Sequence, residues 1–404
     1  MPKGVDIPAL RLSTLTKLVE TDMKVAPGYF QAQFPTSTYP SDTVEWESIV
    51  GNLGLTPFVA PGTVSPTLAP SGVGTHSAKA AFWKEKMYMD EEWLNNLRKP
   101  GARDVYETAE RKLARELFKM KNRCMRRREW MCAKALINDG FSYQVTGGTV
   151  FTLDYGRPSE HEVQLVGNYR WENGTSDSID ILGDVYDAKE AISNATDDEP
   201  TTMLFNSHTA RLLVEDSGIQ NLLKKSNFGN GDLFTRTGPV LSSLFGIPNV
   251  VIMDAKYKVY AYITAISGTT MYVDDVADIE VGMVGRFKNM RSGTYEDETV
   301  SAVDYLTGTV TFASAPSATF VAGRDRIEFT KKFVSDTDVL FYTPRVEGAP
   351  ILEFMNVPFG LDRRYGLKVD RMEEWDPEGL WIRVQNKGLP IIYNRDATYL
   401  LKHD

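Results

Sequence analysis

The stretch that decides the fold is DVYETAERKLARELFKMKNRCMRRREWMCAKALIN, residues 104–138. Its apolar side chains recur at spacings of three, four or seven, as on one face of a helix: Tyr106, Ala109, Leu113, Leu117, Met120, Cys124, Met131 and Ala135. Asp104 is placed to cap the start, and Asp139-Gly140 supplies a stop. The helix would be about 50 Å long. We expect it to lie across a sheet as a spine.

Upstream of this helix, the sequence predicts a long projecting loop. Residues 43–47 alternate as in a strand, and residues 78–89 can return as a second extended segment. Between them, residues 60–77 hold too many Gly and Pro residues for a helix or a central strand. Compact domains rarely carry such a loop without a use for it. Residues 1–40 lack a sustained period, which indicates an extended arm or a disordered terminus.

Downstream of the helix, helical and strand patterns alternate. Residues 151–155 are typical of a strand, and residues 249–253 of a buried strand after a turn. Helical patterns cover residues 179–195 and 209–226, with a strand at 202–205 between them. This part of the chain is therefore expected to be α+β.

The region from about 258 to 330 changes character and is interpreted as an insert. It is rich in Val, Thr, Tyr and Gly, and its short alternating runs are separated by turn signals, which is typical of a small antiparallel barrel or sandwich. Its carboxylates are expected to be solvated, with calcium binding as the alternative: Asp274, Asp275, Asp278 and Glu280.

Composition excludes some classes of function. The formal net charge is −9, whereas tight binding to nucleic acid usually needs a basic surplus. Cys124 and Cys132 would lie about 12 Å apart on one helix, beyond the roughly 7 Å that a disulfide allows. We therefore expect a reducing compartment. No apolar run approaches the ~20 residues of a membrane span.

No motif of catalysis or of cofactor binding is found. The four histidines lack metal-ligand partners at helical or strand spacing, and zinc, P-loop, nucleophile-elbow and EF-hand signatures are absent from the sequence. Three adjacent carboxylates at 197–199 are expected to form a solvated loop. We expect no enzyme, no cofactor and no metal site.

A basic run on the long helix is the one charged feature with a specific expectation. It is either a solvated helix face, a salt-bridge partner for an acidic neighbour, or a weak contact to a polyanion. We predict that its arginines face the acidic base of the loop, within one subunit or between subunits. The residues concerned are Asp90, Glu91, Glu92, Arg126, Arg127 and Arg128.

The order of these elements resembles the E-type major capsid proteins of lambda-like tailed phages. The resemblance covers nearly the whole chain outside the insert, and its separate motifs are short. The matching patterns are Leu55–Pro61, Arg127–Met131 running into Ala133–Gly140, Leu153–Arg157, Trp171 followed by Ile179–Ile181, Asp376–Glu378 and Gly388–Ile392.

This resemblance implies an α+β chain of the Hong Kong 97-like phage capsid fold. On that basis we expect seven segments. They are an N-terminal arm (1–40), an E-loop region (41–103), a peripheral domain with the spine helix (104–180), a first axial part (181–257), the inserted β-rich domain (258–330), a second axial part (331–378) and a C-terminal β segment of the peripheral domain (379–404).

The resemblance also implies function and partners. It implies a virion structural protein that self-assembles, in the host cytoplasm, into hexamers and pentamers of an icosahedral shell around double-stranded DNA. Scaffold, maturation protease, portal and a decoration protein are the implied partners, with only weak contact to DNA and none to membrane. Some relatives crosslink a loop lysine to an asparagine of a neighbour. The loop tip at 60–77 contains no lysine, so we expect a non-covalent shell.

Two alternatives remain open at this stage. The first is another virion subunit, of a tail tube or a decoration protein, although the long helix argues against a tube subunit. The second is a carbohydrate-active enzyme, which would need two carboxylates facing a pocket about 5–9.5 Å apart. No motif in the sequence supports the enzyme.

Overall fold

The computed structural model divides into two compact units. Unit 1 comprises residues 1–135 and 344–394, and unit 2 comprises residues 136–343 and 395–404. Within them, the structure describes residues 28–48, 74–90, 109–144, 150–173, 179–225, 237–274, 276, 278–305, 307–316, 320–375 and 378–404.

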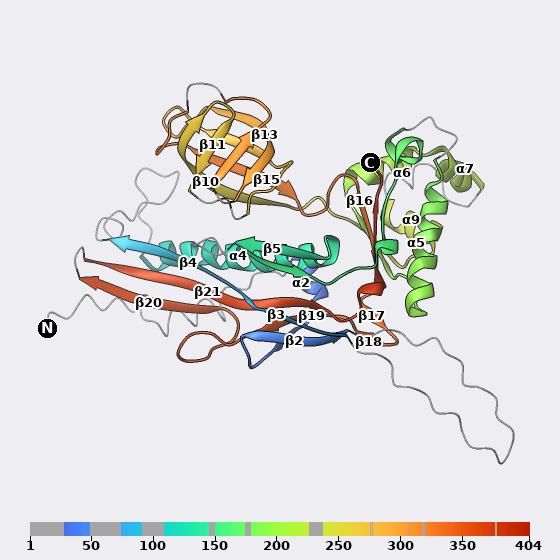
Figure 1. Cartoon of the computed structure of the whole chain (residues 1–404), viewed down its shortest axis with the longest axis horizontal. Coiled ribbons are helices and arrows are strands. Elements are labelled where there is room, and N and C mark those ends of the chain that lie inside the picture. Colours follow the sequence, from blue (N-terminus) through green and yellow to red (C-terminus); the bar gives the residue numbers. More distant parts are fainter. Residues whose placement is uncertain are drawn as a thin grey trace, which may run out of the picture. The chain divides into compact units, whose positions relative to one another are not determined.

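The main sheet of unit 1 is built around one long strand, β21 (Glu378–Ile392). β20 (Lys368–Trp375) forms a hairpin with its first half. β4 (Ala81–Asp90) and β19 (Leu352–Asn356) also pair with β21, at residues 379–388 and 388–392 respectively. β1 (Thr36–Thr38) adds to β19 in parallel. Strands far apart in sequence therefore meet on β21 (Figure 1).

The long helix α4 (Ala109–Ile137) packs one face on this sheet. Leu113, Leu117 and Met120 lie in one buried cluster with Ile382 and Val384 of β21. Each such side chain contributes about 1.5–3 kcal/mol by leaving water. The predicted spine helix is confirmed over this range.

The helix ends where the sequence predicts. Asp139, just after it, has a φ of 57° and Gly140 a φ of 149°, which a helix cannot continue through. The predicted start at residues 104–108 lies outside the described residues.

The described parts of the arm and the loop are also in unit 1. A short helix, α2 (Tyr29–Gln33), precedes β1. β2 (Thr43–Ser48) and β3 (Gly74–Lys79) pair antiparallel over their full lengths. Residues 74–77, predicted as part of the loop tip, are therefore strand, and the predicted returning segment 78–89 is divided between β3 and β4. Residues 60–73 of the predicted tip and residues 1–27 of the predicted arm lie outside the described residues. A small hairpin completes the unit: β17 (Arg345–Val346) and β18 (Ala349–Pro350).

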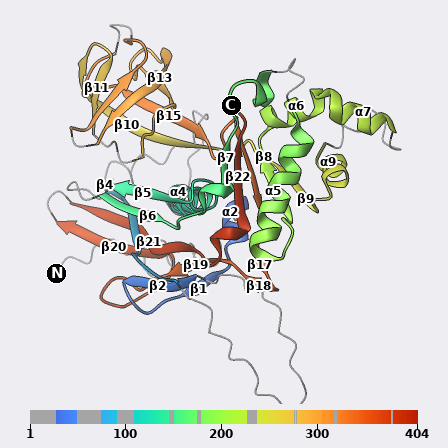
Figure 2. The same cartoon turned by 45° about the vertical axis from the view of Figure 1, so that its right-hand side comes forward.

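Unit 2 contains a second five-stranded sheet. Its order is β7 (Glu162–Gln164), β22 (Thr398–Lys402), β16 (Asp338–Tyr342), β8 (Thr202–Phe205) and β9 (Asn249–Ile252). Helices gather around it (Figure 2): α5 (Ile181–Thr196), α6 (Ser207–Glu215), α7 (Ser217–Lys225) and α9 (Thr237–Phe245). A hairpin of β5 (Gly140–Gln144) and β6 (Val150–Asp154) precedes them.

One predicted helix of unit 2 is two. The pattern at 209–226 predicts a single helix, whereas the chain breaks at Asp216, whose backbone is extended. The Asp216 carboxylate accepts a hydrogen bond from the Ile219 N–H at 2.8 Å, which caps α7.

The insert is a closed six-stranded barrel. In barrel order its strands are β10 (Lys256–Ser267), β11 (Thr270–Val273), β14 (Thr309–Phe312), β13 (Tyr295–Asp304), β12 (Val284–Lys288) and β15 (Arg326–Lys332). Phe287, Phe312 and Phe329 fill its interior. It occupies the stretch for which the sequence predicts an insert and extends it by two residues at each end.

Three of the predicted segments are divided between the two units. The sequence assigns the segment 379–404 to one domain, but β21 belongs to unit 1 and β22 pairs with β16 and β7 in unit 2. The predicted segment 331–378 is likewise divided between units at residue 344, and the segment 104–180 at residue 136. Strand pairing causes these differences, because neighbouring strands in the chain join different sheets.

Candidate functional site

The described end of the arm is held by a carboxylate of the long helix. Glu129 accepts hydrogen bonds from the backbone N–H groups of Phe30, at 2.9 Å, and Gln31, at 2.7 Å. These groups lie in the first turn of α2, whose N-cap, Gly28, has no side chain to satisfy them. Glu129 therefore caps α2 from another element.

Close packing at this contact requires glycine. A Cβ on Gly28 would lie 2.2 Å from the Glu129 carboxyl carbon. Phe30 and Phe34 are fully buried on either side of the turn. Burial raises the pKa of Glu129, and the two N–H groups partly oppose that rise.

The neighbouring residue on the helix holds the next part of the arm. Arg128 donates to the Thr36 hydroxyl, and its guanidinium lies 4.0 Å from the centre of the Phe354 ring. Thr36 and Phe354 are themselves partners in the β1–β19 register. Burial lowers the pKa of Arg128, while Glu129 raises it. Arg128 and Glu129 together form what we call the arm anchor.

The returning limb of the loop is held on the same helix. The Trp83 indole of β4 donates to the Cys124 carbonyl at 3.2 Å and contacts its sulfur at 2.9 Å. Arg123 forms an ion pair with Glu85, also on β4, at 3.0 Å. The arginine is 65% exposed, so the pair contributes only about 0–1 kcal/mol.

Sequence reasoning missed these two contacts. Alternation along β4 could have placed Trp83 and Glu85 on one face, the face that also carries Met87 and Met89. The register between strand and helix could not be read from the sequence.

Both cysteines are buried and free. Burial raises the pKa of the Cys124 thiol to about 12 and raises that of Cys132 as well. Neither thiol is therefore ionised near neutral pH, which makes both inert as nucleophiles.

The described residues show the surroundings of the three predicted arginines but leave their pairing with carboxylates untested. Arg126 is exposed, and Arg127 lies over the Trp130 ring at 5.3 Å. Arg128 has other partners than the predicted ones, because it is buried in the arm anchor. The Asp90 side chain and all of Glu91 and Glu92 lie outside the described residues, so their pairing stays a prediction.

In unit 2, a buried arginine closes the C-terminal end of α4. Arg157 donates to the carbonyls of Leu136, at 2.6 Å, and Ile137, at 3.1 Å, which lack partners within the helix. Its backbone N–H donates to the Asp139 carboxylate. Burial raises the pKa of Asp139 to about 6. This contact gives a physical role to Arg157, the last residue of the Leu153–Arg157 motif.

The described residues contain no group of three His, Cys, Asp or Glu side chains placed to hold a metal. In the acidic stretch of the insert, Asp274 accepts from the Tyr262 N–H at 2.7 Å, and Glu280 pairs with Lys331 at 2.5 Å. In the same described part of the chain, no helix is both long and apolar enough to cross a membrane.

Comparison with solved structures shows similar proteins at low identity. A phage-related protein from Bordetella bronchiseptica RB50 is 13% identical, with 97% of this chain and 96% of that one covered and a TM-score of 0.48. The putative capsid protein of a prophage of E. coli CFT073 is 10% identical, with 97% and 99% covered and a TM-score of 0.48. The capsid of Cyanophage P-SCSP1u is 10% identical, with 94% and 90% covered and a TM-score of 0.43.

No curated protein sequence matches the chain. The family assignment therefore rests on a sequence family: residues 11–270, more than half of the chain, match the family described as phage major capsid protein E. This match confirms the resemblance stated above and, with it, the structural role in the virion. The helices and strands described above confirm the α+β class. The chain belongs to the phage major capsid protein E family.

Proposed function

We propose that the chain builds the hexamers and pentamers of an icosahedral phage head, with its arm and loop reaching across neighbouring subunits. The observation that carries this proposal is the arm anchor. Glu129 and Arg128 fix the arm where it leaves the body, and Trp83 fixes the returning limb of the loop. Both contacts are made by residues of one helix, α4.

Such an arrangement suits a shell. Ordering a free arm costs about 1–2 kcal/mol per residue of backbone entropy. Fixing the base of the arm in the unassembled subunit reduces the number of residues that must be ordered during assembly. The free energy gained by burying area against several neighbours then has to exceed a smaller entropic cost.

The remaining partners are part of the same proposal. Assembly takes place in the host cytoplasm, with a scaffold, a maturation protease and a portal, and with a decoration protein on the finished shell. Contact with packaged double-stranded DNA is weak, because the chain carries a net charge of −9. The predicted pairing of Arg126 and Arg127 with Asp90, Glu91 and Glu92 is proposed as a contact between copies.

Electron microscopy and native mass measurement of the expressed chain, with scaffold present, test the proposal. Closed shells or capsomers are expected. Replacing Arg126 and Arg127 by Glu should lower the yield of shells without unfolding the subunit, since Arg128 is left intact. Lys119→Glu, at an exposed position of the same helix whose ion pair with Glu116 is local, is the control and should leave the yield unchanged. A strictly monomeric wild-type chain at high concentration and moderate salt would contradict the proposal.

A further inference from the structure

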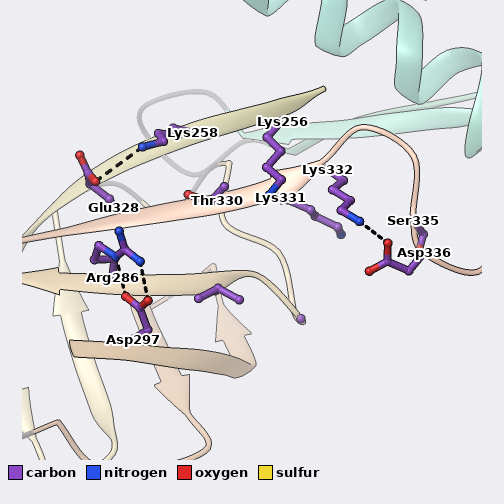
Figure 3. Close-up of a pocket in the computed structure, with 12 residues that line it drawn as sticks. Lys256, Lys258, Arg286, Asp297, Glu328, Thr330, Lys331, Lys332, Ser335 and Asp336 are labelled. Carbon is purple, nitrogen blue, oxygen red and sulfur yellow. Dashed lines mark hydrogen bonds and ion pairs between the residues drawn. The ribbon is translucent and has the colours of Figure 1, made fainter. Parts of the chain in front are cut away.

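One outer face of the inserted barrel carries an unusual gathering of cations. On β10, Lys256 and Lys258 point outward. β15 pairs with β10, and β12 pairs with the other edge of β15. With Arg286, Lys331 and Lys332, these side chains line an open groove of about 570 Å³ (Figure 3). Its lining holds five cations and three carboxylates, which are those of Asp297, Glu328 and Asp336. We call it the basic groove. All of its residues lie within unit 2.

Two lysines in the groove face each other across the strands. Lys256 of β10 and Lys332 of β15 are direct partners in the antiparallel register, and both are amines. Like charges placed opposite one another destabilise a sheet. Lys332 is compensated by Asp336, and Lys258 by Glu328 at 3.8 Å. For Lys256 no ion-pair partner is found among the described residues.

The strands that line the groove also carry side chains that are typical of protein interfaces. Arg286 is fixed by two hydrogen bonds to Asp297, at 2.7 and 2.6 Å, and its guanidinium lies 4.6 Å from the centre of the Tyr295 ring. Arg326 lies 5.2 Å from the centre of the Tyr260 ring. Tyr295 is 65% exposed and therefore does not belong to the core of the barrel. Exposed Tyr and ordered Arg side chains are enriched in protein–protein contacts.

Charge points to the occupant. The barrel is nearly neutral, with nine Lys and Arg against ten Asp and Glu in residues 256–332. Most of the net charge of −9 therefore lies on the rest of the chain. In a shell made of many copies, the acidic surface in greatest supply around each barrel is that of another copy.

We infer that the basic groove binds carboxylates of a second copy of this chain, with Lys256 and Lys332 as the contacting cations. The contact supplies Lys256 with a carboxylate partner. The inference rests on shell formation as proposed above and assigns to the insert the task of joining subunits.

The variant Lys256→Glu separates this role from a role in folding. In the single subunit, the introduced carboxylate would face Lys332 and form a favourable cross-strand pair, so the midpoint of thermal unfolding should stay equal or rise. In assembly, the same change should raise the subunit concentration needed for half-maximal shell formation by about fivefold. Arg291→Glu, in an exposed turn of the same barrel outside the groove, makes the same charge change and should leave both values unchanged.

Two results would overturn the inference. One is a Lys256→Glu chain that assembles at the wild-type concentration. The other is a lower unfolding midpoint, which would show that Lys256 serves the fold. If the wild-type chain forms no shells at all, the proposed function fails before the groove is tested.

Zero-length carbodiimide crosslinking of purified shells identifies the occupant. Bonds from Lys256 or Lys332 to a carboxylate of the same sequence, present in shells and absent from dilute subunits, are expected. Bonds to a different virion protein, or no bond in intact shells, would overturn the inference. Release of the barrel by nuclease treatment would also overturn it, because the occupant would then be DNA.

Discussion

At the scale of single residues, two adjacent side chains of α4, Arg128 and Glu129, together hold the arm. Arg128 and Glu129 are both buried, and burying a charge is costly unless hydrogen bonds compensate it. Glu129 accepts hydrogen bonds from two N–H groups of the arm, and Arg128 contacts Thr36 and Phe354. The arm is thus the partner that makes these buried charges tolerable, so arm and helix stabilise each other.

Glu129→Ala should release the base of the arm. Two N–H groups lose their acceptor, which costs about 1–3 kcal/mol for each buried group left unsatisfied. Amide hydrogen exchange at Phe30 and Gln31 should become at least about fivefold faster, while the sheet strands keep their protection. Glu116→Ala is the control, because the ion pairs of Glu116, with Arg115 and Lys119, are local to the same helix. Equal protection in both variants would contradict the arm anchor.

Asp139 should make the stability of unit 2 depend on pH. Its folded pKa of about 6 exceeds the ordinary value of about 3.9, so the folded state holds the proton more tightly than the unfolded chain. Its contribution is therefore complete below about pH 4 and is lost as the pH rises through 6. Asp139→Asn, neutral throughout, should lack this loss.

The two proteins can be compared by thermal unfolding at pH 4 and pH 7. As the pH is raised from 4 to 7, the unfolding midpoint of the Asn variant should increase by about 2–4 °C relative to that of the wild type. Asp197→Asn, in an exposed turn after α5, is the control and should show no such gain. If the difference in unfolding midpoint between the Asn variant and the wild type is the same at both pH values, titration of Asp139 is ruled out as its cause.

At the scale of elements, the periodicity of the sequence predicts helices and strands. It does not predict contacts with a distant part of the chain. The stripe through Leu113, Leu117 and Met120 was readable because a helix repeats every 3.6 residues. Arg128, in contrast, sits in a run of charged residues that looks solvated in sequence. It is buried because the arm, about 90 residues earlier, packs over it. No local pattern encodes that contact.

The same limit explains the domain boundaries. Val339 and Leu400 are both apolar and both strand residues, but only the register of β16 with β22 shows that they share a sheet. The strands of the barrel can be predicted from the sequence, because a Gly-containing turn marks each of its hairpins. Local turn chemistry is therefore predictable, whereas pairing between distant strands is not.

The barrel should be removable. β10 and β15 are neighbours, and Lys256 lies opposite Lys332, so the two connections to the rest of unit 2 begin about 5 Å apart. Joining residues 255 and 333 by a short Gly/Ser linker should leave the rest of the chain folded by circular dichroism and limited proteolysis.

A cut inside the barrel is the matched control. Deleting residues 295–312, which form β13 and β14, opens the closed barrel and should expose its phenylalanine core to protease. Global unfolding of the chain that lacks the whole barrel would instead show that the barrel is part of the host core.

At the scale of the whole molecule, the shell is expected to be locked without covalent bonds. The lysines nearest the loop tip are Lys79, Lys84 and Lys86. Lys84 and Lys86 lie on β4 with their amines 5.6 Å and 4.1 Å from the ring centres of Phe82 and Trp381. Lys79 is at the end of β3, paired with Thr43 at the base of the loop.

Denaturing electrophoresis of boiled, reduced virions tests this expectation. A single band at the 45.3 kDa monomer is expected. Unboiled virions, which should stay at the top of the gel, serve as the control for intact shells. Bands of covalent pentamers and hexamers that survive reductant would show that a lysine does reach a partner.

The position of β21 in the chain has a consequence for synthesis. Every other strand of the main sheet is attached to β21 directly or through β19, yet β21 ends only at residue 392 of 404. At 5–20 residues per second, roughly 13 s or more pass between the emergence of α4 from the ribosome and that of β21. Through that interval the apolar stripe of α4 has no sheet to cover it. A nascent chain released early lacks the strand on which the sheet is built, so prematurely terminated products cannot present the surface that a growing head accepts.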